Sequence, residues 1–282
     1  MKRFLSLLFC IMMLSGFTLS AYAEGGVADA SQMTTVEEVA EPGMTPVYAA
    51  DLVDGEYSVA FKCSSSMFRI ESALLKVAEG KMEVTLTMGS KSFLRVYPGS
   101  AEEAASKDVW VEPVEDENGA MTFTIPVEAL DAPVPCAAFS KNKELWYDRS
   151  LLFRADSLPV SAFRDGFFTT AESLGLKDGR YMVAVTLSGG SGKAKVQSPT
   201  PLTVENGQCT AVIGWSSKNY DYMKVEGEKY LPVPNEDNSA FVIPVLYFDR
   251  PMPVIADTVA MSEPHEVSYT LFFDSTGLEA AP

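Results

Sequence analysis

Four segments of this 282-residue chain recur in the same order later in the sequence, and this internal repeat constrains the fold more than any other feature. The matched pairs, in chain order, are LVDGEYSVAFKC (52–63) with LKDGRYMVAVTL (176–187), LLKVAEGKMEVTLTMGS (74–90) with PLTVENGQCTAVIGWSS (201–217), TFTIPVEALDAPVP (122–135) with AFVIPVLYFDRPMP (240–253), and RSLLFRADSL (149–158) with YTLFFDSTGL (269–278). Four matches in one order are hard to obtain by chance. They predict two related units in tandem, at 49–157 and 171–278, joined by a linker at 158–170.

Within each unit apolar residues alternate with polar ones. Residues 81–88 (KMEVTLTM) and 209–215 (CTAVIGW) keep a period of two, which is typical of strands with one face on a core. Turn signals such as Asn206-Gly207 separate these stretches at short intervals, and only residues 100–108 (SAEEAASKD) suit a helical turn. Many short strands in units of roughly 100 residues predict an all-β chain of two tandem immunoglobulin-like antiparallel β-sandwich domains.

The N-terminus has the pattern of a secretory signal peptide. Lys2 and Arg3 precede an apolar run, and Ala21-Tyr22-Ala23 fits the cleavage rule, so we expect residues 1–23 to be removed. Residues 24–48 are acidic and poor in large apolar side chains, which predicts a flexible acidic leader. No later stretch is long and apolar enough to span a bilayer. We therefore expect a secreted, extracellular protein, free or associated with the cell surface, with no membrane insertion after signal cleavage.

Charge and cysteine content narrow the choice of partners. The formal net charge is −16, and loss of the two positive charges of Lys2 and Arg3 with the signal takes it to −18. Such an acidic protein should repel nucleic acid and anionic membrane surfaces. Three cysteines remain after cleavage, Cys63, Cys136 and Cys209. A Cys63–Cys136 disulfide and three reduced thiols are both compatible with export.

Of the residue sets of common catalytic sites, the sequence offers only carboxylates, which are numerous enough for a glycosidase-like pair. One histidine, His265, is too few for a His-Glu-x-x-His zinc site, and the cysteines lack the close spacing of structural zinc sites. The segment GGSGK (189–193) resembles a phosphate-binding loop only faintly, because Ala194 stands where that loop needs Ser or Thr. Scattered carboxylates are typical of a solvated surface. We therefore predict a binding protein rather than an enzyme.

An Asp-Gly-x-Tyr strand at 54–57 and 178–181 is followed by a short Ser- or Gly-rich segment, and the late strand YTLFFD lies at 269–274. In this pattern both units show a resemblance to the near-transporter (NEAT) domains of Gram-positive surface proteins. It implies immunoglobulin-like sandwiches that bind haem between that segment and a hairpin near the last strand, and pass it toward an uptake system. The residues it assigns to the apolar lip of the first unit are Ser66, Met67 and Phe68.

The late strand of that family carries a Tyr-x-x-x-Tyr pair whose first member ligates iron, and here the second unit has His265 and Tyr269 at this spacing. Neutral imidazole is a good iron ligand, and a residue four positions along a strand returns to the same face. His265 is thus a candidate metal ligand, with Tyr269 supporting it. The alternative is a solvent-facing histidine at a strand entrance and an ordinary half-buried strand tyrosine.

A second candidate surface lies at 216–233 (SSKNYDYMKVEGEKYLPV). Tyr220 and Tyr222 alternate with polar residues, so we expect both rings on one face of a hairpin that turns at Glu226-Gly227. Beside Met223 they would form a platform for a flat ligand or a peptide; the alternative is a sheet edge that covers its own core. The expected partner is haem or another iron compound, or a surface or transport protein. The competing hypothesis is an extracellular module that binds a protein or a polymer with no cofactor.

Overall fold

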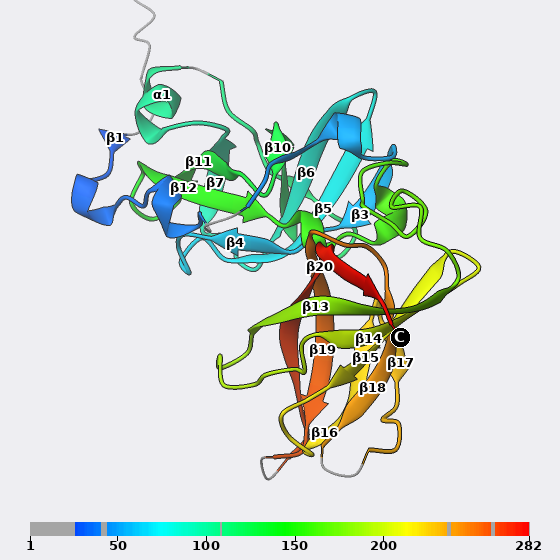
Figure 1. Ribbon diagram of the computed structural model, residues 1–282. Coiled ribbons are helices and arrows are strands. Elements are labelled where there is room, and N and C mark those ends of the chain that lie inside the picture. The colour runs from blue at the N-terminus through cyan, green and yellow to red at the C-terminus, as the bar shows by residue number, and fades with distance from the viewer. Residues whose placement is uncertain (1–25, 41–43, 108, 236–237, 261–262, 282) are drawn as a thin grey trace, which may run out of the picture.

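The computed structural model describes residues 26–40, 44–107, 109–235, 238–260 and 263–281, so the signal peptide expected at 1–23 lies outside the described residues. The described chain is all-β, as predicted. It forms two β-rich bodies, which we call the first half (residues up to 157) and the second half (residues from 171), with residues 158–170 between them (Figure 1). No helix in the described ranges combines the length and the apolar character that crossing a membrane requires.

Helices are few and short in the described chain. The α-helix α1 (Ala101–Ser106) forms where residues 100–108 predict a helical turn, because the Ser100 hydroxyl accepts a hydrogen bond from the Glu103 N–H and the Glu103 carboxylate accepts one from the Ser100 N–H. The other helical elements are 3₁₀ turns: η1 (Ala30–Gln32), η2 (Val36–Glu38), η3 (Ala49–Asp51), η4 (Ala155–Ser157) and η5 (Val160–Ala162).

The first half contains two sheets of five strands whose side chains share one core. One sheet has the order β3-β5-β6-β9-β8, and the other the order β1-β12-β11-β7 with β4 also paired to β12; a two-stranded ribbon, β2 with β10, completes this half. The strands are β1 (Gly26–Val27), β2 (Val47–Tyr48), β3 (Gly55–Ser58), β4 (Phe61–Cys63), β5 (Ile70–Ala78), β6 (Lys81–Met88), β7 (Phe93–Tyr97), β8 (Val114–Glu115), β9 (Met121–Val127), β10 (Ala129–Leu130), β11 (Pro133–Ser140) and β12 (Leu145–Phe153).

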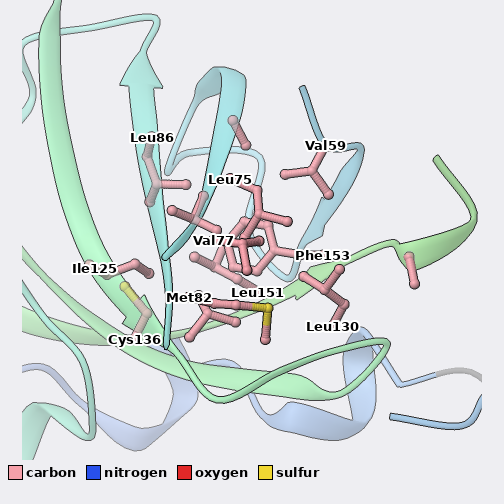
Figure 2. Close-up of a cluster of buried hydrophobic side chains, with 14 of the residues drawn as sticks. Val59, Leu75, Val77, Met82, Leu86, Ile125, Leu130, Cys136, Leu151 and Phe153 are labelled. Carbon is pink, nitrogen blue, oxygen red and sulfur yellow. The ribbon is translucent and has the colours of Figure 1, made fainter. Parts of the chain in front are cut away.

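Figure 2 shows how both sheets fill this core: Leu75 comes from β5, Ile125 from β9, Leu151 from β12 and Cys136 from β11. Each side chain is at most 1 % exposed, and burial of a side chain of this size stabilises the fold by about 1.5–3 kcal/mol.

The alternation predicted for residues 81–88 is confirmed, since Met82, Val84, Leu86 and Met88 are buried while the residues between them are more exposed. The same holds for Cys209, Ala211, Ile213 and Trp215 in the second half.

The second half forms one sheet of eight strands in the order β17-β16-β19-β20-β13-β14-β15-β18. The strands are β13 (Gly179–Gly189), β14 (Thr200–Glu205), β15 (Gln208–Gly214), β16 (Tyr220–Val225), β17 (Glu228–Tyr230), β18 (Ala240–Val245), β19 (Pro251–Thr258) and β20 (His265–Ala280). Strands from both ends of this order contribute to one buried core, so the sheet curls around that core.

The two halves pair their strands in the same order. The early part of β13, residues 179–183, pairs with β14, and the later part, residues 184–189, pairs with β20. In the first half the corresponding stretch is interrupted at Val59-Ala60, so that β3 pairs with β5 while β4 pairs with β12. In the second half, the continuous strand β13 therefore joins all eight strands into one sheet. In the first half, the two short strands β3 and β4 take its place and belong to two separate sheets.

Tight hairpins connect neighbouring strands at the expected dipeptides. Asn206-Gly207 joins β14 to β15 with φ values of 52° and 76°, and Glu226-Gly227 joins β16 to β17 with 47° and 84°. Two successive positive φ values define the two-residue turn whose twist matches that of paired strands, and glycine adopts the second position without strain.

The prediction of a flexible leader at 24–48 is wrong for the residues that the structure describes. β1 pairs in parallel with the edge of β12, and β2 pairs with β10. Val39 and Val47 are each 2 % exposed. The low hydrophobicity of residues 24–48 predicted flexibility. A few apolar side chains, such as Val39 and Val47, are nevertheless enough to hold this segment against the first half.

Residues 158–170 connect the halves as a packed segment. Phe163 forms a bridge to Leu52 of the first half, and Thr169 forms one to Phe248 of the second. Ala162 and Phe163 are buried. The linker is therefore part of both bodies rather than a free tether.

Cys63, Cys136 and Cys209 are all free thiols in the structure, which favours the second of the two alternatives. Cys63 lies opposite Leu151 and Cys136 lies opposite Arg149, so β12 runs between the two cysteines. Two inter-strand spacings, about 9–10 Å, separate them across the strands, and an offset of two residues along β12 adds to this distance. A disulfide needs Cα atoms within roughly 7 Å. A Cys63–Cys136 bridge would require the backbone to move.

Candidate functional site

Three aromatic side chains meet inside the second half, and two of them are predicted site residues. The ring of Tyr220, from β16, lies 4.0 Å from that of Trp215, and Tyr269, from β20, meets Trp215 edge-on at 5.1 Å. The hydroxyl oxygens of Tyr220 and Tyr269 are 3.0 Å apart and share a hydrogen bond. Tyr269 is only 6 % exposed. We call Trp215, Tyr220 and Tyr269 the tyrosine pair site.

The surroundings of this site favour the protonated form of the Tyr220 hydroxyl. Burial raises the pKa of Tyr220 well above its ordinary value, and the hydrogen bond with Tyr269 raises it further. Above the site, the loop that follows β13 passes close to the ring of Tyr269. A Cβ atom on Gly190 would lie 2.6 Å from a ring carbon of Tyr269, so glycine is what lets this loop approach.

His265 lies at the start of β20, opposite Thr258, and is exposed to solvent. It is four residues from Tyr269 on the same strand, which corresponds to about 13 Å along an extended chain. The exposed His265 and the buried Tyr269, whose hydroxyl bonds to Tyr220, are therefore not brought together as a pair. In the described part of the chain no group of three or more His, Cys, Asp or Glu side chains is placed to hold a metal ion.

The expectation that Tyr220 and Tyr222 project from one face of the hairpin is wrong. Tyr220 pairs with Thr258 while Tyr222 pairs with the adjacent residue Asp257, so Asp221 is an extra residue that forms a bulge. The bulge reverses the alternation. Tyr220 thus points toward the core and Tyr269, whereas the Tyr222 hydroxyl donates to Glu266 Oε1 at 2.7 Å on the outer side.

Tyr222 belongs to a charged surface group instead. Lys229 Nζ lies 3.5 Å from the centre of its ring, and Lys224 forms an ion pair with Glu266. The hydrogen bond to Glu266 raises the pKa of Tyr222 to about 12. Each member of this group has a partner within the group.

Met223 does not contribute to an exposed platform. Its side chain is fully buried, and its sulfur accepts a hydrogen bond from the Trp215 indole Nε1–H at 3.3 Å. Met223 forms the inner wall of the tyrosine pair site. Successive residues of a strand face opposite sides, so Met223 points inward while its neighbour Tyr222 points outward.

The three residues expected to form an apolar lip in the first half do not act together. Ser66 and Met67 lie in an exposed turn after β4, with Met67 73 % exposed, and no helix forms there. Phe68 is 1 % exposed and packs edge-on against Phe93 at 5.1 Å, so it is a core residue. No hydrogen bond or ring contact among the described residues joins these three to the predicted residues of the second half.

Sequence reasoning missed a cavity of about 710 Å³ between the two halves. Its walls include Phe167 and Phe168 of the linker, Asp131 and Arg154 of the first half, and Arg250 of the second. The signal that could have revealed it is the aromatic content of the linker, FRDGFF, since a free tether has no need of three phenylalanines.

No family model and no curated protein matches this chain. The function must therefore be argued from geometry. The resemblance to NEAT domains stays a prediction.

Proposed function

We propose that this chain is an exported, non-enzymatic binding protein built from two immunoglobulin-like β-sandwich units, and that its second unit binds haem or a related iron compound for transfer to an uptake system. The common order of strand pairing in the two halves supports the tandem arrangement. The signal-like N-terminal sequence supports export and an extracellular or cell-surface location.

The observation that carries the ligand proposal is the hydrogen-bonded pair Tyr220 and Tyr269 beside Trp215. Tyrosine oxygen is an established haem ligand, and flat aromatic walls suit a porphyrin. Tyr269 lies on the late strand β20 and beneath the loop where the resemblance implies a haem pocket. Tyr269 is buried, so the loop at 189–192 must move aside for a porphyrin to reach it.

Protonation sets a condition on this binding. Iron coordinates the phenolate form, and the raised pKa of Tyr220 keeps its hydroxyl protonated, so this hydroxyl can donate a hydrogen bond to a Tyr269 oxygen bound to iron. We assign Tyr269 as the preferred ligand and Tyr220 as its hydrogen-bond partner. His265, which is exposed at the strand entrance, is the second candidate ligand.

A haem titration tests the proposal. Purified protein with added haem should develop a Soret band, and Tyr269→Phe should abolish or shift that band while Tyr222→Phe, whose hydroxyl lies on the outer side, leaves it unchanged. If His265→Ala removes the band instead, the ligand is His265. Protein that stays colourless with excess haem contradicts the haem proposal and leaves the competing hypothesis, an extracellular module for a protein or polymer partner.

A further inference from the structure

The cavity between the halves has the place and the size of a small-molecule site. It is an open pocket of about 710 Å³, lined by both halves and by the linker. Ligand sites occur preferentially at domain interfaces, in volumes of about 300–1,000 Å³. None of the residues predicted from the sequence lines it.

One wall of the cavity is aromatic. Phe168 stacks on Tyr247 with ring centres 4.1 Å apart and planes at 12°, and Phe167 meets Phe168 edge-on at 4.9 Å. Phe167 and Phe168 are only partly buried, so their rings keep accessible surface. This wall favours a ligand with an apolar side chain.

The rim of the cavity carries a cation, Arg250, that has an aromatic neighbour and no ion-pair partner in the described chain. The Arg250 guanidinium lies 4.2 Å from the centre of the Phe167 ring, and no hydrogen bond or ion pair of Arg250 occurs among the described residues. Arg154, by contrast, donates to Asp156 through Nε at 2.9 Å. A guanidinium free to make two parallel hydrogen bonds is the preferred group for binding a carboxylate.

Carboxylates line the same cavity as Arg250. Asp131 lines it and accepts a hydrogen bond from the Ala155 N–H at 3.0 Å through Oδ1. Asp156 and Asp249 also line the cavity. A simple anion would be repelled by these carboxylates, and a simple cation would be repelled by Arg250, so the charges are complementary to a zwitterion.

We propose that this cavity binds a free α-amino acid with a large apolar side chain. Its carboxylate pairs with Arg250, its ammonium group faces Asp131, and its side chain packs on Phe167 and Phe168. The site is independent of the tyrosine pair and needs no haem.

Calorimetric titration of the full chain with four related compounds tests the ligand class. L-Phenylalanine or L-leucine should bind, whereas phenylacetate, which lacks the ammonium group, and phenethylamine, which lacks the carboxylate, should bind about tenfold more weakly or worse. Absence of binding by both amino acids at millimolar concentration overturns the proposal. Equal binding of phenylacetate or phenethylamine overturns it as well.

Arginine variants test the location. Arg250→Gln should weaken the binding of L-phenylalanine by about tenfold or more, and Arg250→Lys, which keeps the charge, should recover part of it. The matched control is Arg164→Gln, because Arg164 pairs with Asp54 and does not line this cavity. Circular dichroism establishes that each variant is folded. Equal weakening in Arg164→Gln and Arg250→Gln places the binding elsewhere and overturns the assignment, whereas an effect confined to Arg250 supports it.

Discussion

Tyr269 brings a hydroxyl group into the apolar core of the second half, where its partner is the hydroxyl of Tyr220. Tyr269→Phe keeps the ring contact with Trp215 but leaves the Tyr220 hydroxyl without this partner. We expect a loss of about 0.5–1.5 kcal/mol in the free energy of unfolding, measured by urea denaturation. Tyr222→Phe, which removes a more exposed hydroxyl bonded to Glu266, is the control and should cost less. A larger loss for Tyr222→Phe would contradict the buried hydrogen bond.

The same two tyrosines show what residue patterns can and cannot predict. Alternation correctly indicated a strand, and Glu226-Gly227 correctly indicated its turn, because both depend on local backbone preferences. Alternation could not reveal the bulge at Asp221, because a single inserted residue is set by how β16 fits against β19. The orientation of Tyr220, and with it the tyrosine pair, depended on that tertiary contact.

At the scale of elements, the loop after β13 depends on two glycines whose surroundings differ. Gly190 has φ +54° and a Cβ there would lie 2.6 Å from the Tyr269 ring, while Gly192 has φ +74° and no atom within 4 Å of such a Cβ. Gly192→Ala should therefore cost only the left-handed backbone penalty, about 1–2 kcal/mol. Gly190→Ala should cost more, because the loop must also shift away from Tyr269.

Thermal denaturation of the two variants measures this difference, and equal midpoints would show that the loop does not rest on Tyr269. An increase in haem binding by Gly190→Ala would be consistent with a loop that covers the proposed site.

Elements differed in how well the sequence predicted them. The core strands of both halves were predictable because each carries its own apolar alternation. The leader was not, since β1 has only the two residues Gly26 and Val27 and exists because the edge of β12 is available to pair with it. The composition of a segment describes that segment in isolation. An edge strand is stabilised by the strand it pairs with, so its composition alone does not predict it.

At the scale of the whole molecule, the cavity between the halves links stability to pH through Asp131. The pKa of this carboxyl is raised from 3.8 to about 6, chiefly by burial and to a smaller degree by Asp156. The hydrogen bond from Ala155 and the charges of Arg154 and Arg250 partly offset this increase. The folded state thus keeps a proton that the unfolded state releases near pH 4. The contribution of Asp131 to the free energy of unfolding is most favourable below about pH 4 and is lost as the pH rises to about 6.

Asp131→Asn tests this linkage, because asparagine tolerates the φ of +53° and can accept the Ala155 hydrogen bond without titrating. The difference in unfolding free energy between wild type and variant should change between pH 4 and 6 and be constant above that window. Asp249→Asn is the control, since Asp249 also has a positive φ (60°) and accepts hydrogen bonds from Ser275. A pH-independent difference for Asp131→Asn would rule out its proton uptake.

The aromatic cluster of the linker should determine whether the two halves behave as one body toward proteases. Phe168 packs on Phe163 at 4.8 Å and on Tyr247 at 4.1 Å, and it contacts the cores of both halves. Intact packing should protect residues 158–170 from chymotrypsin.

Phe168→Ala should lower the free energy of unfolding by about 2 kcal/mol, which is below the usual cost of removing a phenylalanine ring because this ring is only partly buried. The variant should also be cleaved early in the linker, and a gel should then show two β-rich fragments. Leu231→Ala, which alters a 68 % exposed side chain, should leave the pattern unchanged. Wild-type protein cut in the linker as fast as the Phe168→Ala variant would mean that the halves are tethered rather than packed together.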